Sequence, residues 1–317
     1  MRNYIIKRLL LSIPALLLVS IIAFMLMRIV PGSIVDLMAG DQGFVSGMDR
    51  AKIEAAMGLD KPLLTQYGTW IKNVVLHGDL GKSLWDKESI TSKIAERWPV
   101  TLELGLLALI ISQLIALPIG IYSALRQDTI GDYVARSFAI LCIAIPSFWL
   151  ATMVIVFPSI WWGYSPPIVF IKFLSDPLGN LKIFIVPAIV LGMTMAGMTM
   201  RMTRAVMLEV LRQDYVRTAW AKGLRERVVV LRHALKNAMI PIITIIGMQV
   251  PTLVGGTVII ENIFSLSGMG RLLIEATDAR DYTVVSGVVL FFGFALIIVN
   301  LLVDVTYGFF DPRISYR

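Results

Sequence analysis

Charged side chains are scarce in this sequence, since Asp, Glu, Lys and Arg together make up 16% of its 317 residues, while apolar side chains make up 57%. The mean hydropathy is +0.77. Soluble globular domains contain about 25% charged and about 45–50% apolar residues. The composition therefore excludes an ordinary soluble globule and indicates an integral membrane protein, for which membrane lipid is one partner.

Cysteine and histidine are also nearly absent. The single cysteine, Cys142, cannot form an intrachain disulfide, and its place within an apolar run favours a small buried hydrophobe over a redox role. The histidines, His77 and His233, belong to no cluster with metal-ligand spacing. They also allow no Ser/His/Asp set within one compartment. We therefore predict no catalytic residue, no metal site and no cofactor bound by this chain.

A nucleotide-binding loop is missing as well. Gly81-Lys82-Ser83 looks like the end of a P-loop, but that pattern needs a glycine five positions before Gly81, where Leu76 stands. A turn is the favoured interpretation of this segment. The chain is therefore predicted not to hydrolyse ATP by itself.

What the sequence does contain is long apolar runs. A helix of about 20 residues spans the hydrocarbon core of a bilayer, so the runs predict an all-α integral membrane protein with six transmembrane helices. Pro146 lies inside the third run and is expected to bend that helix. The runs are Leu9–Val30, Thr101–Leu125, Tyr133–Pro158, Ile183–Met200, Ala238–Ile260 and Val284–Val305.

The runs divide the chain into parts. Residues 1–30 are predicted to form the N-terminus and the first span, and residues 31–99, which are too polar to cross, an extracytoplasmic subdomain between helices 1 and 2. Residues 101–308 would form the transmembrane core, with a basic loop at 201–237. Residues 309–317 would form a cytoplasmic tail.

The orientation follows from that basic loop. Between Arg201 and Lys236 it holds nine Lys or Arg residues against three acids. Short basic loops stay in the cytoplasm, so the loop and both termini are predicted to be cytoplasmic. The net charge of +7 is explained by this bias, and no nucleic-acid partner is predicted.

The loop is expected to be helical and to contain an elbow. Tyr215–Lys222 is predicted to form a short helix, and Gly223 to interrupt it, because glycine costs about 1 kcal/mol in a helix interior and readily adopts positive φ. A second basic helix is expected over Leu224–Asn237. The small side chains that this elbow would present to a cytoplasmic partner are Thr218, Ala219 and Ala221.

These strings have a parallel in a known family. YVRTAWAKGL followed by RHALKNAMIP resembles the EAA loop of ABC-transporter membrane subunits, in the variant of the peptide (oligopeptide, dipeptide and nickel) permease group. The Glu-Ala that leads the general motif is replaced by Arg217-Thr218, and the gap from Gly223 to Pro241 is longer than in the general form. Both departures fit the peptide group. The strings Gly58–Pro62, Gly78–Ser83, and ENIFSLSGMGRLL followed by ARDYTVV resemble it too.

The resemblance implies a type I ABC importer-like fold and the permease subunit of an ATP-driven importer in a bacterial inner membrane. It also implies a homologous second permease, two cytoplasmic ATPases that bind ATP and Mg²⁺, and an extracytoplasmic solute-binding protein. The implied substrate is a di- or oligopeptide, with nickel complexes, glutathione-like peptides and oligosaccharides as alternatives. The residues implied to couple to the ATPases are Arg217, Thr218, Ala219, Lys222 and Gly223.

Several polar or adaptable side chains within the runs are candidates for lining the transport pathway. Polar groups at mid-membrane need either a neighbouring helix or a water-filled cavity, and methionine suits a lining for varied substrates. Helix packing remains the alternative interpretation for each of them. The candidates are Gln113, Met195, Met198, Gln249 and Thr252.

Two other functional classes are weighed against the importer. An ion-driven carrier or channel would need buried carboxylates along its route, and the central parts of the runs contain no acid. A structural assembly factor would use the basic loop only as a topology anchor. Association with ATPases that depends on Ala219 and Gly223 would separate the importer from that anchor.

Overall fold

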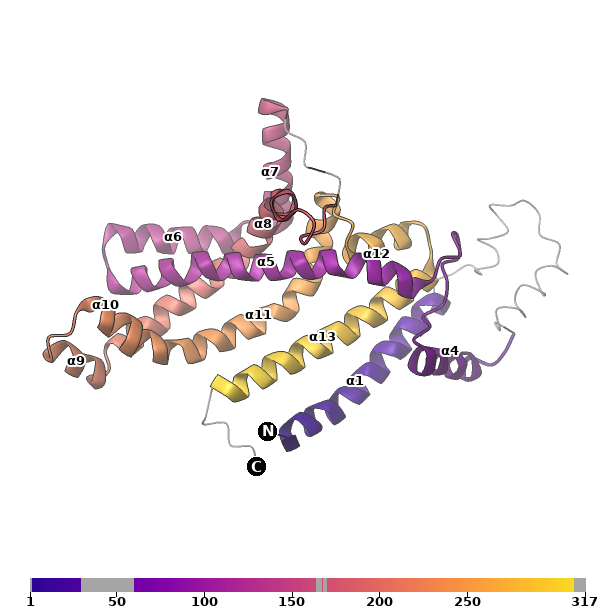
Figure 1. The fold of residues 1–317 in the computed structure, drawn as a ribbon, viewed down its shortest axis with the longest axis horizontal. Coiled ribbons are helices and arrows are strands. Elements are labelled where there is room, and N and C mark those ends of the chain that lie inside the picture. Colours follow the sequence, from indigo (N-terminus) through magenta and orange to yellow (C-terminus); the bar gives the residue numbers. More distant parts are fainter. Residues whose placement is uncertain (1, 30–59, 164–166, 168–169, 311–317) are drawn as a thin grey trace. The chain divides into compact units, whose positions relative to one another are not determined.

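The computed structural model describes residues 2–29, 60–163, 167 and 170–310 (Figure 1). Within these ranges the regular structure is helical, and the described part holds no strand beyond an isolated bridge between Lys82 and Ser89. Predictions for residues 31–59, for the string Gly58–Pro62 and for the end of the tail at 309–317 lie outside the described residues, in whole or in part. The helices are α1 (Arg2–Ile29), α4 (Leu63–His77), α5 (Ile90–Leu125), α6 (Ile130–Ala144), α7 (Ser147–Trp162), α8 (Pro177–Leu211), α9 (Asp214–Ala221), α10 (Glu226–Val228), the π-helical η1 (Val229–Ala234), α11 (Leu235–Ile263), α12 (Met269–Asp278) and α13 (Tyr282–Phe310).

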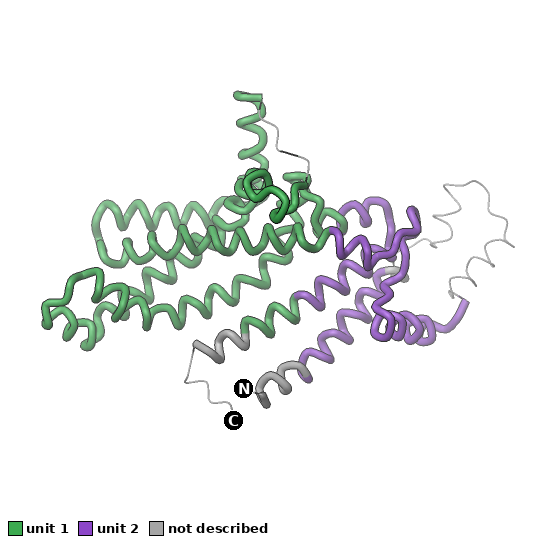
Figure 2. Tube along the Cα trace, viewed as in Figure 1, with its two compact units in different colours: residues 1–8, 97–272, 296–317 green, residues 9–96, 273–295 purple. Residues whose placement is uncertain are grey.

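The chain separates into two compact units, which Figure 2 shows in different colours. Unit 1 comprises residues 1–8, 97–272 and 296–317, and unit 2 comprises residues 9–96 and 273–295. Both units are built from segments that lie far apart in the sequence. The domain boundaries predicted from the sequence stay a prediction.

The helices confirm a multi-pass membrane protein. Four described helices are long and apolar enough to cross a membrane, namely α5, α8, the helix from Glu226 to Ile263, and Tyr282–Val303 of α13. The pair α6 and α7 is a fifth if it counts as one bent span. The first predicted span falls on α1, whose apolar described part is Leu10–Leu26. The total of six therefore stays a prediction.

The third predicted span is broken rather than merely bent. Helix α6 ends at Ala144, Ile145 and Pro146 have extended backbones, and α7 starts at Ser147 at an angle of 96° to α6. Proline disfavours helical geometry in the residue before it and supplies no N–H for a continuing helix. The expectation of one continuous kinked helix over Tyr133–Pro158 was therefore wrong.

Helix α8 is the packed centre of unit 1. It extends beyond the predicted span Ile183–Met200 at both ends, and many of its residues are buried. A Cβ on Gly192 would lie 2.7 Å from the carbonyl oxygen of Ala108, and one on Gly197 would lie 2.7 Å from that of Ala139. Glycine thus lets α5 and α6 approach the α8 backbone closely, as small residues do in membrane bundles.

The segment that resembles the end of a P-loop, Gly81-Lys82-Ser83, is hydrogen-bonded to a distant part of unit 2. The Ser83 hydroxyl donates to Oδ2 of buried Asp281 at 2.6 Å, and the backbone N–H of Leu84 donates to the same oxygen at 3.1 Å. The other oxygen of Asp281 accepts from the N–H of Val284, in the first turn of α13, at 3.3 Å. Two strings with the same family resemblance, 198 residues apart at Ser83 and Asp281, therefore meet at one carboxylate.

A second buried carboxylate lies at the C-terminal end of α11 in unit 1. Glu261 lies in the last turn of α11 and is 0% exposed. Its Oε1 accepts from the Thr101 hydroxyl at 2.7 Å, and its Oε2 accepts from the N–H groups of Gly270 at 2.7 Å and Arg271 at 3.3 Å. The Thr101 oxygen accepts from the N–H of Met269 at 2.8 Å. The carboxylate thus caps the first turn of α12.

This cap requires glycine at position 270. A Cβ there would lie 2.3 Å from the Cα of Val258, which is backbone and cannot rotate away. We expect Gly270→Ala to destabilise the protein by about 1–3 kcal/mol, as overpacking does, and to lower the midpoint of thermal unfolding of the purified protein. Gly105→Ala is the matched control, because no atom lies within 4 Å of its added Cβ. Equal midpoints for the two variants would contradict the prediction.

Candidate functional site

The predicted elbow is present between α8 and α11 (Figure 1). Helix α9 spans Asp214–Ala221, close to the predicted Tyr215–Lys222, and Gly223 follows it with φ of +72°. The N–H of Gly223 donates to the Trp220 carbonyl at 2.9 Å. No atom lies within 4 Å of a Cβ built on Gly223. Glycine is therefore required here for its backbone conformation and not for space.

The elbow has a small core of its own. Val216 and Val229 are both 0% exposed and Ala219 is 5% exposed, so α9 packs its Val216–Ala219 face on the start of the next helix. The prediction that Ala219 is presented at the surface was therefore wrong. The spacing of Val216 and Ala219, three residues apart, is the helical signal that could have placed them inside. The half-buried residues around this core are Val210, Leu211 and Leu224.

The exposed side of α9 combines apolar and basic groups. Trp220 is 43% exposed and Tyr215 is 41% exposed. These two aromatic residues lie within the string that resembles the EAA loop, but neither was among the predicted coupling residues. Large exposed aromatics next to positive charge are typical of protein-binding surfaces. The exposed residues that accompany them from the predicted coupling set are Arg217, Thr218, Lys222 and Gly223.

Two further contacts hold the elbow to the membrane helices of unit 1. The Asn237 side-chain N–H donates to the Tyr215 hydroxyl at 2.8 Å, which ties α9 to α11. Arg126, after α5, lies 3.8 Å from Glu226 of α10, but this pair is exposed and contributes little to stability. The turn between these contacts is π-helical over Val229–Ala234. π-Helical turns are rare in proteins, and those that occur frequently lie at functional sites.

A buried ion pair lies at the same end of the helices as the elbow. Arg204 of α8 binds Asp132 of α6 with two parallel hydrogen bonds, from Nε at 2.8 Å and from Nη2 at 2.7 Å. The Asp132 side chain is 0% exposed and also accepts from the Ser123 hydroxyl and from the N–H of Asp128. The pair joins the α5–α6 connection to α8. In the sequence Arg204 is one of nine basic residues of the loop, and no local pattern assigns a role to Asp132.

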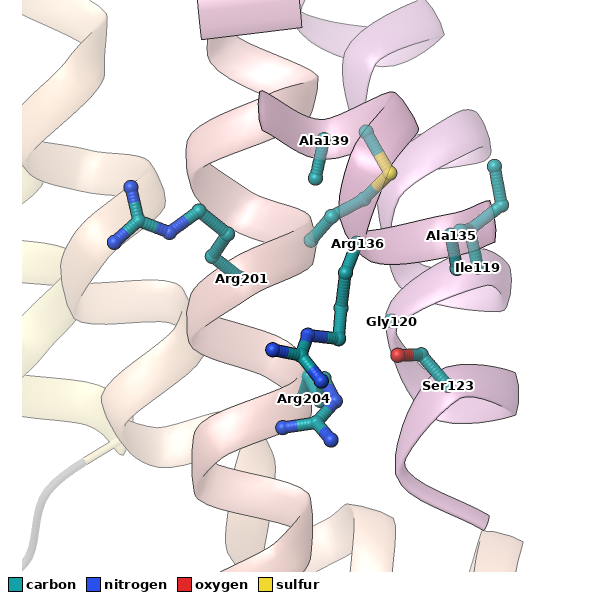
Figure 3. Close-up of a pocket in the computed structure, with 9 residues that line it drawn as sticks. Ile119, Gly120, Ser123, Ala135, Arg136, Ala139, Arg201 and Arg204 are labelled. Atoms are coloured by element: carbon teal, nitrogen blue, oxygen red, sulfur yellow. The ribbon is translucent and has the colours of Figure 1, made fainter. Parts of the chain in front are cut away.

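A small pocket lies beside this ion pair, between α5, α6 and α8 (Figure 3). Its inner wall is apolar, with Ile119 and Ala139 among its residues, and Arg136, Arg201 and Arg204 contribute the charged part. Figure 3 shows Arg201 extending away from Arg136 and Arg204. Positive charge gathered at this end of the helices is the pattern on which the predicted cytoplasmic orientation rests.

The residues predicted to line the pathway differ in how exposed their side chains are. Gln249 of α11 is buried and its Nε2 donates to the Thr199 hydroxyl of α8 at 3.3 Å, so its amide joins two helices. Met195 is buried in the core of unit 1. By contrast, Met198 of α8 is 55% exposed, and Thr252 of α11 is exposed, with its hydroxyl donating to the Gln249 carbonyl.

Gln113 is half-buried on α5. Its Nε2 donates to the Ser112 hydroxyl at 2.7 Å, while its Oε1 is buried without a hydrogen-bond partner. Among the five candidates, only Met198 and Thr252 therefore offer an exposed side chain to a pathway in this subunit. That Gln113, Met195 and Gln249 line the pathway stays a prediction. It would require the helices to move so that these side chains become exposed, or these side chains to act through neighbouring residues.

Comparison with known proteins gives family matches over most of the chain. Residues 116–316 match the model of the binding-protein-dependent transport system inner membrane component, and residues 1–105 match the model of the N-terminal part of such membrane components. A protein of Brucella suis biovar 1 named as a peptide transport system permease is 41% identical over 316 residues, covering 100% of both chains. The dipeptide transport system permease protein DppB of Escherichia coli K12 is 39% identical over 341 residues, again covering 100% of both.

A third relative and a solved structure extend these matches. The glutathione transport system permease protein GsiC of Salmonella choleraesuis is 36% identical over 317 residues and covers 100% of both chains. In fold, the chain is similar to a chain of the MetNI methionine ABC transporter in an inward-facing conformation, with a TM-score of 0.57 and 16% identity. That likeness covers 70% of this chain and 97% of the other.

Proposed function

The chain belongs to the family of binding-protein-dependent transport system inner membrane components, and we propose that it forms half of the translocation pathway for di- and oligopeptides in an ABC importer. As a member of this family, it is a multi-pass permease subunit of a bacterial ABC importer and not the ATPase. Its inner-membrane location follows from the family. The substrate, the partner subunits and the residues that couple the subunit to the ATPases are proposed from these similarities and contacts.

The proposed complex contains a homologous second permease, two cytoplasmic ATPases and an extracytoplasmic solute-binding protein. ATP and Mg²⁺ are held by the ATPases. Both termini of this chain and its elbow face the cytoplasm, since the basic loop would otherwise have to be translocated. This orientation gives the elbow access to the ATPases.

Coupling is proposed to occur through the exposed side of α9. Trp220 supplies an apolar side chain and Arg217 and Lys222 supply charge, which together suit a groove on a soluble partner. Because α9 packs on the start of the next helix through Val216, Ala219 and Val229, a rotation of the docked elbow would be transmitted to α11. ATP binding would thereby switch the pathway from inward-open to outward-open.

The observation that carries the substrate proposal is the full-length similarity to permeases named for peptide and dipeptide transport, at 39–41% identity. The relative named for glutathione is 36% identical over its whole length, so glutathione-like peptides are the second candidate. Nickel complexes and oligosaccharides are the remaining alternatives that the family resemblance implies.

The test is uptake by the assembled importer in proteoliposomes with its binding protein. We expect labelled dipeptides to accumulate only with ATP, with unlabelled dipeptides competing more strongly than glutathione, nickel complexes or oligosaccharides. An ionophore that abolishes ion gradients should leave uptake unchanged. Uptake that stops with the ionophore and continues without the ATPases would identify an ion-driven carrier and overturn the proposal.

A further inference from the structure

Helix α4, in unit 2, has a wide apolar face but no buried residue. Most of its apolar side chains recur at helical spacing, and Thr65, Thr69 and Asn73 lie on the opposite side together with Leu76, which is 64% exposed. The helix contains no acidic residue, and its basic residues are Lys72 and His77. The apolar positions of the face are Leu63, Leu64, Tyr67, Trp70, Ile71, Val74 and Val75.

One edge of this face is occupied by α1. The Tyr67 hydroxyl hydrogen-bonds with the Ser20 hydroxyl at 2.7 Å, and the Tyr67 ring meets Phe24 edge-on at 5.3 Å between centroids. The Trp70 ring lies 5.7 Å from the same Phe24. Phe24 is 1% exposed and Ser20 is 2% exposed, so α4 is firmly seated on α1.

The other edge of the apolar face of α4 is exposed. Leu64 is 85% exposed and Val75 is 71% exposed, and positions 64 and 75 project in nearly the same direction from a helix with 3.6 residues per turn. On α1, Leu17 and Ile21, which project from the helix close to the direction of Ser20 and Phe24, are also exposed, at 49% and 43%.

The level at which α4 is attached to α1 favours lipid over water as the cover of this face. Ser20 and Phe24 precede the end of α1 at Ile29 by nine and five residues, which corresponds to about 7–14 Å along the helix. The hydrocarbon core is about 30 Å thick, and amphipathic surface helices sink about 5–10 Å into the boundary between headgroups and acyl chains. With the N-terminus of α1 in the cytoplasm, α4 is therefore held within the outer half of the bilayer.

We infer that α4 is a membrane-surface helix whose Leu64–Val75 edge is covered by lipid of the outer leaflet. In this position Lys72, which borders the apolar edge, reaches the headgroups and favours anionic lipids, while Thr69 and Asn73 face water. Part of the predicted extracytoplasmic subdomain then lies in the membrane surface. This inference rests on α1 as a span and on the proposed cytoplasmic N-terminus, and on neither the substrate nor the coupling proposal.

A protein cover is the competing occupant. A second permease on this edge would exclude lipid and water alike from Leu64 and Val75. An aqueous position would leave both side chains accessible to water-soluble reagents. Lipid, protein and water therefore give three different accessibilities at the same two positions.

The sequence makes this test simple, because Cys142 is the single cysteine. In a Cys142→Ala background, spin labels are placed singly at Leu64→Cys and Val75→Cys, with Thr69→Cys and Asn73→Cys as matched controls on the opposite side of α4. The assembled importer is studied in bilayers, and each variant must retain uptake. We expect the labels at 64 and 75 to be relaxed by oxygen at least twofold more than by a water-soluble nickel chelate, with the reverse ranking at 69 and 73.

Either of two results would overturn the inference. Labels at 64 and 75 that neither reagent reaches would indicate a protein partner on this edge, and labels relaxed mainly by the nickel chelate would indicate water. Should one cysteine variant fail to assemble, the other of the pair gives the same readout independently. The controls at 69 and 73 exclude a general effect of labelling α4.

Discussion

Gly223→Pro is expected to abolish ATP-driven uptake while leaving the subunit inserted in the membrane. Proline fixes φ near −65°, whereas Gly223 has φ of +72°, so the chain after α9 would have to take another direction. Gly223→Trp should act in the same way, because a bulky residue at positive φ is strongly disfavoured. A local strain of about 1–3 kcal/mol would lower the population of the docking-competent elbow by about 5- to 150-fold.

The effect is measured as uptake per inserted importer, together with the ATPase that copurifies. Gly223→Asn is the matched control, because asparagine tolerates the left-handed conformation better than other residues do. A side chain at position 223 would meet no steric hindrance at its Cβ, since no atom lies within 4 Å of a Cβ built there. We therefore expect most of the uptake to survive in Gly223→Asn. Normal uptake by a well-inserted Gly223→Pro importer would refute the coupling role of the elbow.

Arg204→Met is expected to destabilise the protein by about 3–5 kcal/mol, because it leaves a buried carboxylate without its counter-charge. The Asp132 side chain is 0% exposed and would retain only the Ser123 hydroxyl and the Asp128 N–H as partners. The connection between α5 and α6 would then separate from α8. The measurement is the midpoint of thermal unfolding of the purified protein in detergent, with the yield of inserted protein as a second readout.

Two further variants distinguish the effect of breaking the ion pair from the effect of removing any arginine. Arg136→Met removes an exposed arginine of the same pocket and should change stability by no more than about 0.5 kcal/mol. The double variant Asp132→Leu with Arg204→Met removes both charges, and buried pairs replaced by apolar side chains are often neutral. We expect it to recover most of the loss. A double variant as unstable as Arg204→Met alone would show that the charge left behind is not the cause.

Local patterns in the sequence were sufficient for several features. The length and composition of the apolar runs predicted a helical membrane protein, and the conformational freedom of glycine predicted the break at Gly223, which the structure confirms. The turn predicted at Gly81-Lys82-Ser83 lies just after it, at residues 84–86, while Lys82 forms an isolated bridge with Ser89. Each of these inferences depends on residues that are close neighbours in the chain.

Other features were misjudged because hydropathy alone did not decide them. Pro146 was expected to bend one helix, but the extended backbone at Ile145 and Pro146 breaks it into α6 and α7. Ala219 was assigned to a surface by its size, although it packs against Val216 and Val229. A small side chain suits an interface and a core equally well, so only the packing of α9 on the next helix could assign it.

By itself, the sequence determined that this protein is helical, crosses a membrane several times and carries a basic, glycine-jointed elbow, because all of these follow from composition and short-range spacing. Tertiary structure alone decided which polar groups meet. Arg204 and Asp132 are 72 residues apart, Thr101 and Glu261 are 160 apart, and Ser83 and Asp281 are 198 apart. A buried charge must be paired or hydrogen-bonded, but its partner is fixed by how the helices pack, and local spacing does not encode that choice.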